Sequence, residues 1–183
     1  MREFLRIYGH NEKASTLISQ KIQCIFQNNQ NNVVFLCVGT DKIIFDSLGC
    51  MVGQILKNSN FPFYIYGDLQ KCITGKNVAF AIDYIRTMHP FSVVCVVDAM
   101  ATTSQSHLDE IIITDEYVSS LSSNIKINAD IFIYGITTVL NEKVKIGAGC
   151  KLYNIYNLAK VICDALFCSY NEAKNPPDIQ ECA

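Results

Sequence analysis

Charged residues are scarce in this sequence, and neither sign dominates. Charged side chains make up 17% of the 183 residues, hydrophobic ones make up 50%, and the formal net charge is -2. A chain this apolar is not intrinsically disordered, because disordered chains combine low hydrophobicity with high charge. No basic surplus exists to neutralise phosphates, so we expect no nucleic-acid partner.

Long apolar runs are also missing. No stretch of about 18 uninterrupted apolar residues occurs, so no membrane span is expected. The N-terminal letters MREFLRIYGHNEK are too interrupted for the apolar region of a signal peptide. The nine cysteines are odd in number, and Cys37 and Cys95 lie inside apolar runs, where a thiol behaves as a small hydrophobic group. We therefore predict free thiols in the reducing cytoplasm rather than a disulfide framework.

Motifs for the common metals and nucleotides are absent. No CxxC pair or HxxxH spacing exists, so a structural zinc site has little support. The segment GTDKIIFDSLG, from Gly39 to Gly49, lacks the GK[ST] and GxGxxG arrangements and places an acid where an anion would bind. We expect no nucleotide and no resident cofactor.

One continuous pattern of alternating strands and helices fills most of the chain. The length fits a single domain over residues 1–183, with an N-terminal helix and loop over 1–32 and a flexible tail over 171–183. Helical spacing of apolar residues predicts helices over Glu12 to Phe26, Ser47 to Lys57, Val78 to Met88 and Ile155 to Phe167. Apolar runs predict strands over Val33 to Gly39, Phe61 to Tyr66, Ser92 to Ala99, Ile111 to Thr114 and Ile131 to Ile136.

Two of these strands are apolar throughout, in VVFLCVG and SVVCVVDA. Buried parallel strands have this composition, because helices cover both of their faces. We therefore predict an α/β protein, a three-layer sandwich around a mostly parallel sheet.

Two acids follow such strands. Asp98 ends the run SVVCVVD, and Asp46 follows the first strand through a loop and begins the next helix. Ligands of open α/β sheets bind outside the carboxyl ends of the strands. If the two strands are neighbours, as in the common 2-1-3 order, the two carboxyl groups converge.

Neighbouring carboxyl groups support two kinds of chemistry. Sharing one proton, they act as base and acid around a water that attacks an amide. Alternatively, they bind a divalent cation together with a third ligand. Asp46 also has a structural interpretation as the N-cap of the helix that follows it. Asp98 is expected to be partly buried, which is costly for an ionised carboxyl without a partner.

Four further polar residues are candidates for binding a substrate. Asp41 and Lys42 lie on the loop that leads to Asp46, and the backbone near Ser47 at the helix start could stabilise an oxyanion. Asp130 begins the strand DIFIYG, so it reaches the same edge only if that strand runs antiparallel to the others.

The sequence also resembles a known family, the small sporulation proteins of the YyaC type. CVGTDKIIFDSLGCMVG, from Cys37 to Gly53, resembles CIGTDRSTGDSLGPLVG, and YIYGDLQKCITGKNV resembles VYGTLxxPVHAxNL. VVCVVDAM resembles IIAIDAC, and NADIFIYGIT resembles VGDISITGIV. The four matches occur in the same order and span roughly residues 30 to 165. Asn77, in the second of these segments, joins the substrate-binding candidates.

That family is similar to the germination protease of bacterial spores and, more distantly, to hydrogenase-maturation proteases. The resemblance implies their phosphorylase/hydrolase-like fold. It also implies a catalytic pair at Asp46, in FDSLG, and Asp98, in VDAMA. In hydrogenase-maturation proteases the equivalent acids bind a nickel ion of the client protein.

The chain departs from the family pattern near the first acid. The family's Arg-Ser-Thr-Gly stretch is Lys42, Ile43, Ile44 and Phe45 here, the Pro after DSLG is Cys50, and PVHA is Cys72, Ile73, Thr74 and Gly75. The sequence thus predicts a sporulation-related peptidase that takes a protein or peptide substrate, as a monomer or an oligomer. A protein-binding module without catalysis, using Ile43 to Phe45 as an apolar patch, and a metal-binding hydrolase remain alternatives.

Overall fold

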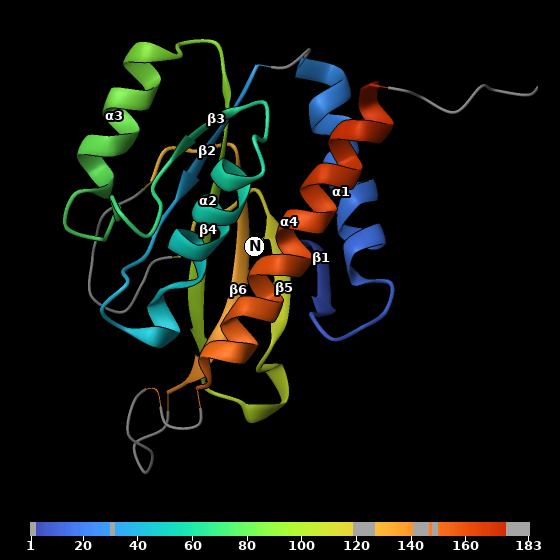
Figure 1. Ribbon diagram of the computed structural model, residues 1–183, viewed down its shortest axis with the longest axis vertical. Coiled ribbons are helices and arrows are strands. Elements are labelled where there is room, and N and C mark those ends of the chain that lie inside the picture. Colours follow the sequence, from blue (N-terminus) through green and yellow to red (C-terminus); the bar gives the residue numbers. More distant parts are fainter. Residues whose placement is uncertain (1–2, 30–31, 119–126, 141–146, 148–149, 175–183) are drawn as a thin grey trace, which may run out of the picture.

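A six-stranded sheet forms the centre of the protein, in a computed structural model that describes residues 3–29, 32–118, 127–140, 147 and 150–174 (Figure 1). The strands are β1 (Glu3–Tyr8), β2 (Val33–Cys37), β3 (Tyr64–Tyr66), β4 (Val93–Thr102), β5 (Glu110–Thr114) and β6 (Ile131–Val139). The α-helices are α1 (Ala14–Asn29), α2 (Leu48–Asn58), α3 (Val78–Met88) and α4 (Leu152–Lys174). Two short 3₁₀ helices are η1 (Ile44–Asp46) and η2 (Gln105–His107).

The strand order is β1-β5-β6-β4-β2-β3. β3, β2, β4 and β6 pair in parallel, whereas β5 runs antiparallel to both β6 and β1. The neighbouring positions of β3, β2 and β4 confirm the predicted 2-1-3 order of the first three parallel strands. A mostly parallel sheet with helices on both faces is the predicted α/β architecture.

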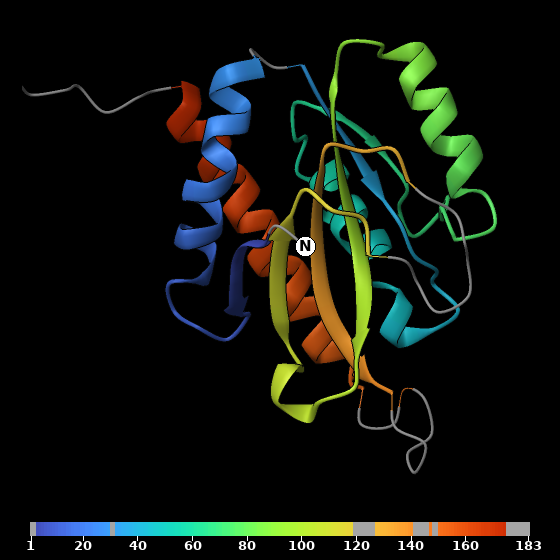
Figure 2. The same cartoon turned by 180° about the vertical axis from the view of Figure 1, so that it is seen from behind.

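The two faces of the sheet bury separate cores. Figures 1 and 2 show α1, α2 and α4 on one face and α3 on the other. On β2, Val33, Phe35 and Cys37 pack toward the first group of helices, whereas Val34 and Leu36 pack toward α3. This alternation follows from the two-residue period of a strand. Because both faces are covered, the central strands are apolar throughout.

The predicted helices and parallel strands are confirmed, with differences at several boundaries. β3 begins at Tyr64 rather than at Phe61. β4 continues past Asp98 to Thr102, because it stays paired with β6 as far as Val139. α4 reaches Lys174, so residues 171–174 are helical rather than part of a flexible tail. Residues 175–183 lie outside the described part of the chain. The N-terminal segment, expected to hold a helix and a loop, begins with β1.

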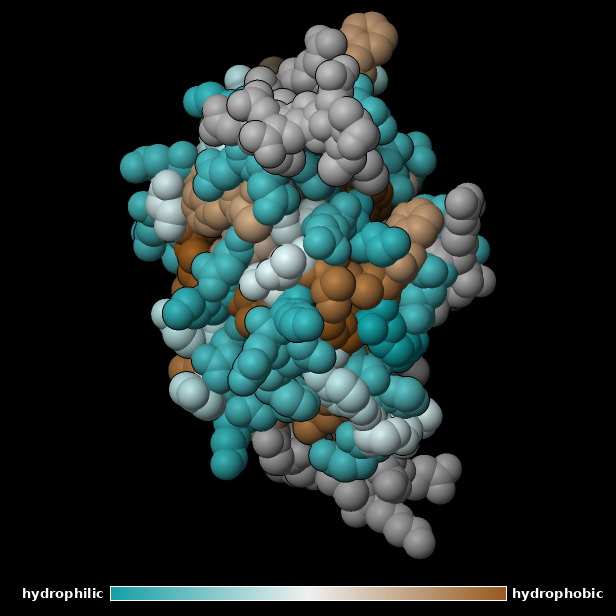
Figure 3. All heavy atoms as spheres, turned by 90° about the vertical axis from the view of Figure 1, so that its right-hand side faces the viewer, coloured by the Kyte–Doolittle hydropathy of each residue, from teal (hydrophilic) through white to brown (hydrophobic). Residues whose placement is uncertain are grey.

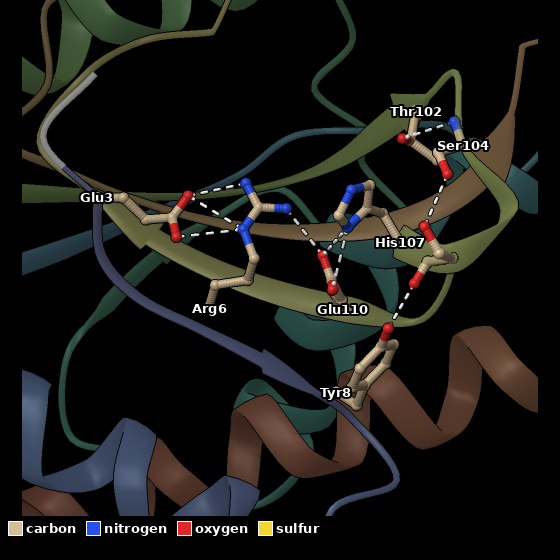
Figure 4. A network of polar contacts seen from close by, with 8 residues as sticks. Glu3, Arg6, Tyr8, Thr102, Ser104, His107 and Glu110 are labelled. Atoms are coloured by element: carbon tan, nitrogen blue, oxygen red, sulfur yellow. Dashed lines mark hydrogen bonds and ion pairs between the residues drawn. The ribbon is translucent and has the colours of Figure 1, made fainter.

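Polar contacts hold the edge strand β1 on β5 (Figure 4). The Arg6 guanidinium forms ion pairs with Glu3 and with the buried Glu110, at 2.8 Å in each case, and Glu110 also contacts His107 Nδ1 at 3.1 Å. Arg6 and His107 hold the pKa of the Glu110 carboxyl below its usual value, against the opposing effect of burial. The Tyr8 hydroxyl donates to the backbone oxygen of Ser106. These polar contacts compensate for the small apolar surface that β1 buries, since Ile7 is its only buried residue.

The surface on the side of α1 and β1 is mostly polar, with apolar side chains in patches among polar ones (Figure 3). No helix in the described ranges is both long enough and apolar enough to cross a membrane.

The first turn of α2 lies directly on the end of β2 and the middle of β4. A Cβ atom added to Gly49 would lie 2.0 Å from the backbone oxygen of Val38 and 2.6 Å from that of Val97. Only a residue without a side chain allows the helix to approach the two strands so closely. Gly49 therefore sets the position of the whole segment that precedes α2.

The first prediction concerns this contact. We expect Gly49→Ala to lower the free energy of unfolding by about 3 kcal/mol or more, because backbone atoms must move to admit the methyl group. Gly75→Ala is the matched control, since a Cβ there meets nothing within 4 Å, and its effect should stay within about 0.5 kcal/mol. Urea denaturation of the two variants measures both values. Equal stability of the two variants would contradict the close approach of α2.

Candidate functional site

The end of β2 defines the position of Asp98 on the neighbouring strand. β2 ends at Cys37, which is paired with Val97, so Asp98 is the first residue of β4 beyond that end. Its partner on the other side is Tyr134 of β6. The prediction that Asp98 terminates its strand was wrong, because β4 is longer than β2. Asp98 nevertheless lies just beyond the carboxyl end of the neighbouring strand β2.

The chain leaves β2 at Gly39 and returns to this edge through η1. The Thr40 N–H donates to the backbone oxygen of Asp46 at 2.8 Å, and the Thr137 hydroxyl of β6 donates to the backbone oxygen of Phe45. Gly39 has a φ of +149°, and a Cβ there would lie 2.2 Å from the oxygen of Asp46. These contacts fix η1 against β4, β6, α2 and α4.

Asp46 does not cap α2. It is the last residue of η1, and Ser47 occupies the N-cap position without a capping hydrogen bond from its side chain. Among the described residues, no hydrogen-bond donor contacts the Asp46 carboxyl group. The structural interpretation of this acid as an N-cap is therefore wrong, and its half-buried carboxylate is available for chemistry.

Burial dominates the ionisation of Asp98. It raises the pKa of this carboxyl to about 8, although a hydrogen bond of 2.7 Å from the Ala99 N–H favours the ionised form. The negative charge of Asp46 raises the Asp98 pKa further. Burial and, to a smaller extent, the charge of Asp98 raise the pKa of Tyr134, whose hydroxyl accepts a hydrogen bond of 3.0 Å from the Val118 N–H.

The surroundings of both acids favour their protonated forms. Burial raises the pKa of Asp46, and burial together with the charge of Asp46 raises the pKa of Asp98. With a pKa of about 8, Asp98 is mainly a carboxylic acid at neutral pH. Two like charges in one partly buried site separate their pKa values in this way.

The loop residues near Asp46 differ in their surroundings. Asp41 is exposed and accepts a hydrogen bond from the Cys72 thiol at 3.6 Å, and Lys42 is exposed as well. Ser47 is buried, and both its hydroxyl and its N–H donate to the backbone oxygen of Ile44. The Ser47 N–H is thus engaged in the turn, and the prediction that backbone N–H groups near Ser47 stabilise an oxyanion concerns the other N–H groups at the start of α2.

The two remaining candidates lie in different places. Asn77 precedes α3 and accepts a hydrogen bond of 2.7 Å from the Thr74 N–H, so it stabilises the turn there. Asp130 lies at the opposite edge of the sheet, because β6 runs parallel to β4. It accepts a hydrogen bond from the Val94 N–H at 2.7 Å and pairs with Arg86 at 3.0 Å. Its prediction as a substrate-binding residue was wrong for this reason.

Sequence reasoning missed the thiols that accompany the acids. Cys50 is buried in the first turn of α2, and Cys72, before α3, donates a hydrogen bond of 3.6 Å to the Asp41 carboxylate. Their positions in the sequence showed only that they replace two family prolines. No group of three or more His, Cys, Asp or Glu side chains arranged to hold a metal ion occurs in the described part of the chain.

Comparisons with known proteins relate the whole chain to others. A segment of 68 residues is 37% identical to the uncharacterized protein YyaC of Bacillus subtilis (strain 168), over 37% of this chain and 33% of that protein. The structure is similar to the [NiFe] hydrogenase maturation protease HycI from Thermococcus kodakarensis KOD1, with a TM-score of 0.49 and 17% identity, over 80% of this chain and 99% of that chain. The model of a family described as "Protein of unknown function (DUF1256)" matches residues 6–165. Because this match spans most of the sequence, the chain belongs to the DUF1256 family.

Proposed function

We propose that the protein is a hydrolase that cleaves a peptide bond, with Asp46 as the general base and Asp98 as the general acid. The observation that carries this proposal is the Asp98 carboxyl beyond the end of β2, whose pKa is raised to about 8 by burial and by the charge of Asp46. Hydrolysis of an amide needs a proton acceptor for water and a proton donor for the carbonyl oxygen or the leaving amine. Asp98, protonated at neutral pH, is the proposed donor, and Asp46 is the proposed acceptor.

The reaction would use the pair as follows. The Asp46 carboxylate accepts a proton from a water molecule as its oxygen attacks the amide carbon. Asp98 donates its proton to the carbonyl oxygen, and when the tetrahedral intermediate collapses the leaving nitrogen takes a proton from Asp46. The carbon–nitrogen bond breaks, and the hydroxyl proton returns to Asp98. No external reactant besides water is consumed.

Three further observations support a peptidase of this kind in a sporulation setting. The YyaC-type motifs, through their similarity to the germination protease, assign the same two acids. The edge that holds the acids is where ligands of α/β sheets bind. Seven cysteines among the described residues are free thiols, in accord with a reducing cytoplasm. A protein or peptide is the proposed substrate.

A second candidate function is protein binding without turnover. Its support is the exposure of Ile43 and Ile44, which are 43% and 48% accessible on the loop before Asp46. Phe45 is half-buried, so the predicted patch consists of two residues rather than three. Partner binding that survives replacement of both Asp46 and Asp98 but is lost in Ile43→Ser would favour this function over catalysis.

The second prediction concerns the coupling of the acids. We expect Asp46→Asn to lower the pKa of Asp98, because the variant removes a negative charge that opposes its ionisation. Carbon-detected NMR titration of aspartate carboxyl groups measures this value directly. Asp83→Asn, on the exposed side of α3, is the control and should leave Asp98 unchanged. An Asp98 pKa that is the same in all three proteins would refute a shared site.

The third prediction uses the pH dependence of folding stability as a second measure of the Asp98 pKa. Its pKa of about 8 in the folded protein lies above the ordinary value near 3.9 of the unfolded chain. Between these two pH values the unfolded chain binds fewer protons, so folding stability falls as the pH rises from about 4 to about 8. We expect Asp98→Asn to remove up to about 5 kcal/mol of this pH dependence and to be more stable than the wild type at pH 8. Urea denaturation at several pH values provides the test, and an unchanged slope in the variant would contradict the raised pKa.

The fourth prediction concerns activity. We expect cleavage of a defined mixture of synthetic peptides, followed by mass spectrometry, to decline as the pH rises through about 8, where Asp98 loses its proton. The Asp98→Asn variant should lose about 10²–10⁴-fold in rate, since an amide cannot donate that proton. Asp130→Asn, at the opposite edge, is the control and should cleave at the wild-type rate. Full cleavage by Asp98→Asn would exclude the proposed acid.

A further inference from the structure

A cavity lies between α4 and the turn that follows β1. Its volume is about 510 Å³, which is within the range of roughly 300–1,000 Å³ that small-molecule sites have. Figure 1 shows the end of β1 beside the first half of α4, and a Cβ on Gly9 would lie 2.4 Å from the Leu158 side chain. Neither Asp46 nor Asp98 lines this cavity, so it is separate from the proposed catalytic pair.

The backbone holds the carboxyl group of Asp109 at the wall of the cavity. Asp109 has a φ of +65°, in the left-handed region that Asn and Asp adopt more readily than other residues with a side chain. Its N–H donates to the Ile136 oxygen of β6 at 2.9 Å, and its own backbone oxygen accepts from the Gly9 N–H at 2.8 Å. Asp109 is therefore fixed from both sides.

This carboxyl group has capacity for a ligand. The Asn154 side chain donates to one of its oxygens at 3.5 Å, a long contact, and no ion pair of the described residues includes Asp109. A carboxylate accepts up to about four hydrogen bonds. Burial raises the pKa of Asp109, and the charge of His10 opposes that rise. A cationic group of a ligand therefore meets an acceptor that the protein satisfies only in part.

The first half of α4 continues the polar lining in a row. Asn154, Asn157 and Lys160 follow one another at intervals of three residues, so they are neighbours on the helix surface. Lys160 is exposed and has no hydrogen-bond or ion-pair partner among the described residues. Leu158 and Val161 add apolar surface to the same cavity. The cavity thus has an acid at one end, an amide in the middle and a cation at the other end.

We propose that this cavity is a binding site for a short peptide of two or three residues with free ends. The terminal ammonium group binds Asp109, the terminal carboxylate binds Lys160, and the Asn157 amide bonds to a peptide group between them. From Asn154, beside Asp109, to Lys160 the helix rises about 9 Å. Two or three extended residues span about 7–11 Å, so their length fits this separation.

The same charges limit the length of the ligand. Asp164 also lines the cavity and is exposed, one turn of α4 beyond Lys160. A longer peptide would bring its terminal carboxylate toward this acid, and like charges repel each other. A single amino acid is too short to reach both Asp109 and Lys160. The site is therefore selective for dipeptides and tripeptides.

The experiment is isothermal titration calorimetry of the full-length protein with trialanine, which measures binding and needs no cleavage. We expect one peptide to bind per chain. N-acetyl-trialanine, trialanine amide and tetraalanine should each bind about tenfold more weakly, because each loses or misplaces one charged contact. Absence of trialanine binding, or equal affinity for all four peptides, would overturn the proposal.

Two variants locate the peptide. Asp109→Asn keeps a residue that tolerates the left-handed backbone, and Lys160→Met keeps the apolar stem, so each removes chiefly a charge. Each should weaken trialanine binding about tenfold, whereas the matched controls Asp83→Asn and Lys174→Met should bind as the wild type does. Asp109→Asn should leave the affinity for N-acetyl-trialanine unchanged, since that peptide lacks the group that Asp109 binds.

A further variant separates this site from the proposed catalytic pair. The inference does not rest on the proposed function, so Asp98→Asn should bind trialanine with the wild-type affinity even where it has lost cleavage. Loss of binding in Asp98→Asn together with full binding in Asp109→Asn would place the peptide at the other site and overturn the proposal.

Discussion

The contact of the first turn of α2 with the end of β2 and the middle of β4 is the constraint on which the site depends. Gly49 lies against the backbone oxygens of Val38 and Val97, so the helix begins directly above the point where β2 stops. The preceding turn has no room to extend outward and folds back along the same edge. Asp46 and Cys50 lie on either side of this contact. They are thereby placed near the level of Asp98, the first residue of β4 that is not paired with β2.

Different strand lengths explain why an ionisable group can exist inside such an apolar sheet. Asp98 alternates onto the face that packs against α3, with Val94 and Val96, and its neighbour on β6 is the buried Tyr134. β2 ends one residue before this level and leaves one side of β4 without a strand. The turn η1 occupies that edge, and the Asp46 charge acts on Asp98 from there. A longer β2 would replace this space with another backbone and remove the site.

Much of this arrangement could be predicted from the sequence, since it depends on local patterns. Apolar runs and helical spacing gave the parallel strands, the four α-helices and the adjacency of the strands that carry Asp46 and Asp98. β1 was missed because only Ile7 is fully buried in it and its stability comes from ion pairs with a distant strand. The position of Asp130 depended on the direction of β6, and apolar composition does not reveal strand direction. The position of the Cys72 segment beside the end of β2 depends on a backbone pairing between Val38 and Ile73, which leaves no periodic signal.

The raised pKa of Asp98 gives a physical reason to regard this edge as more than a structural feature. Burial that raises a carboxyl pKa to about 8 destabilises the folded protein at neutral pH, because the unfolded chain is free to ionise. A protein selected for stability alone would carry an apolar residue or an amide there, where Val94 and Val96 already form an apolar row. Glu110 provides the contrast within the same sheet, since its buried carboxylate is neutralised by Arg6 and has a lowered pKa. Among the described residues, then, Glu110 has a cationic partner and Asp98 has none, and this contrast is the physical basis for proposing Asp98 as the acid.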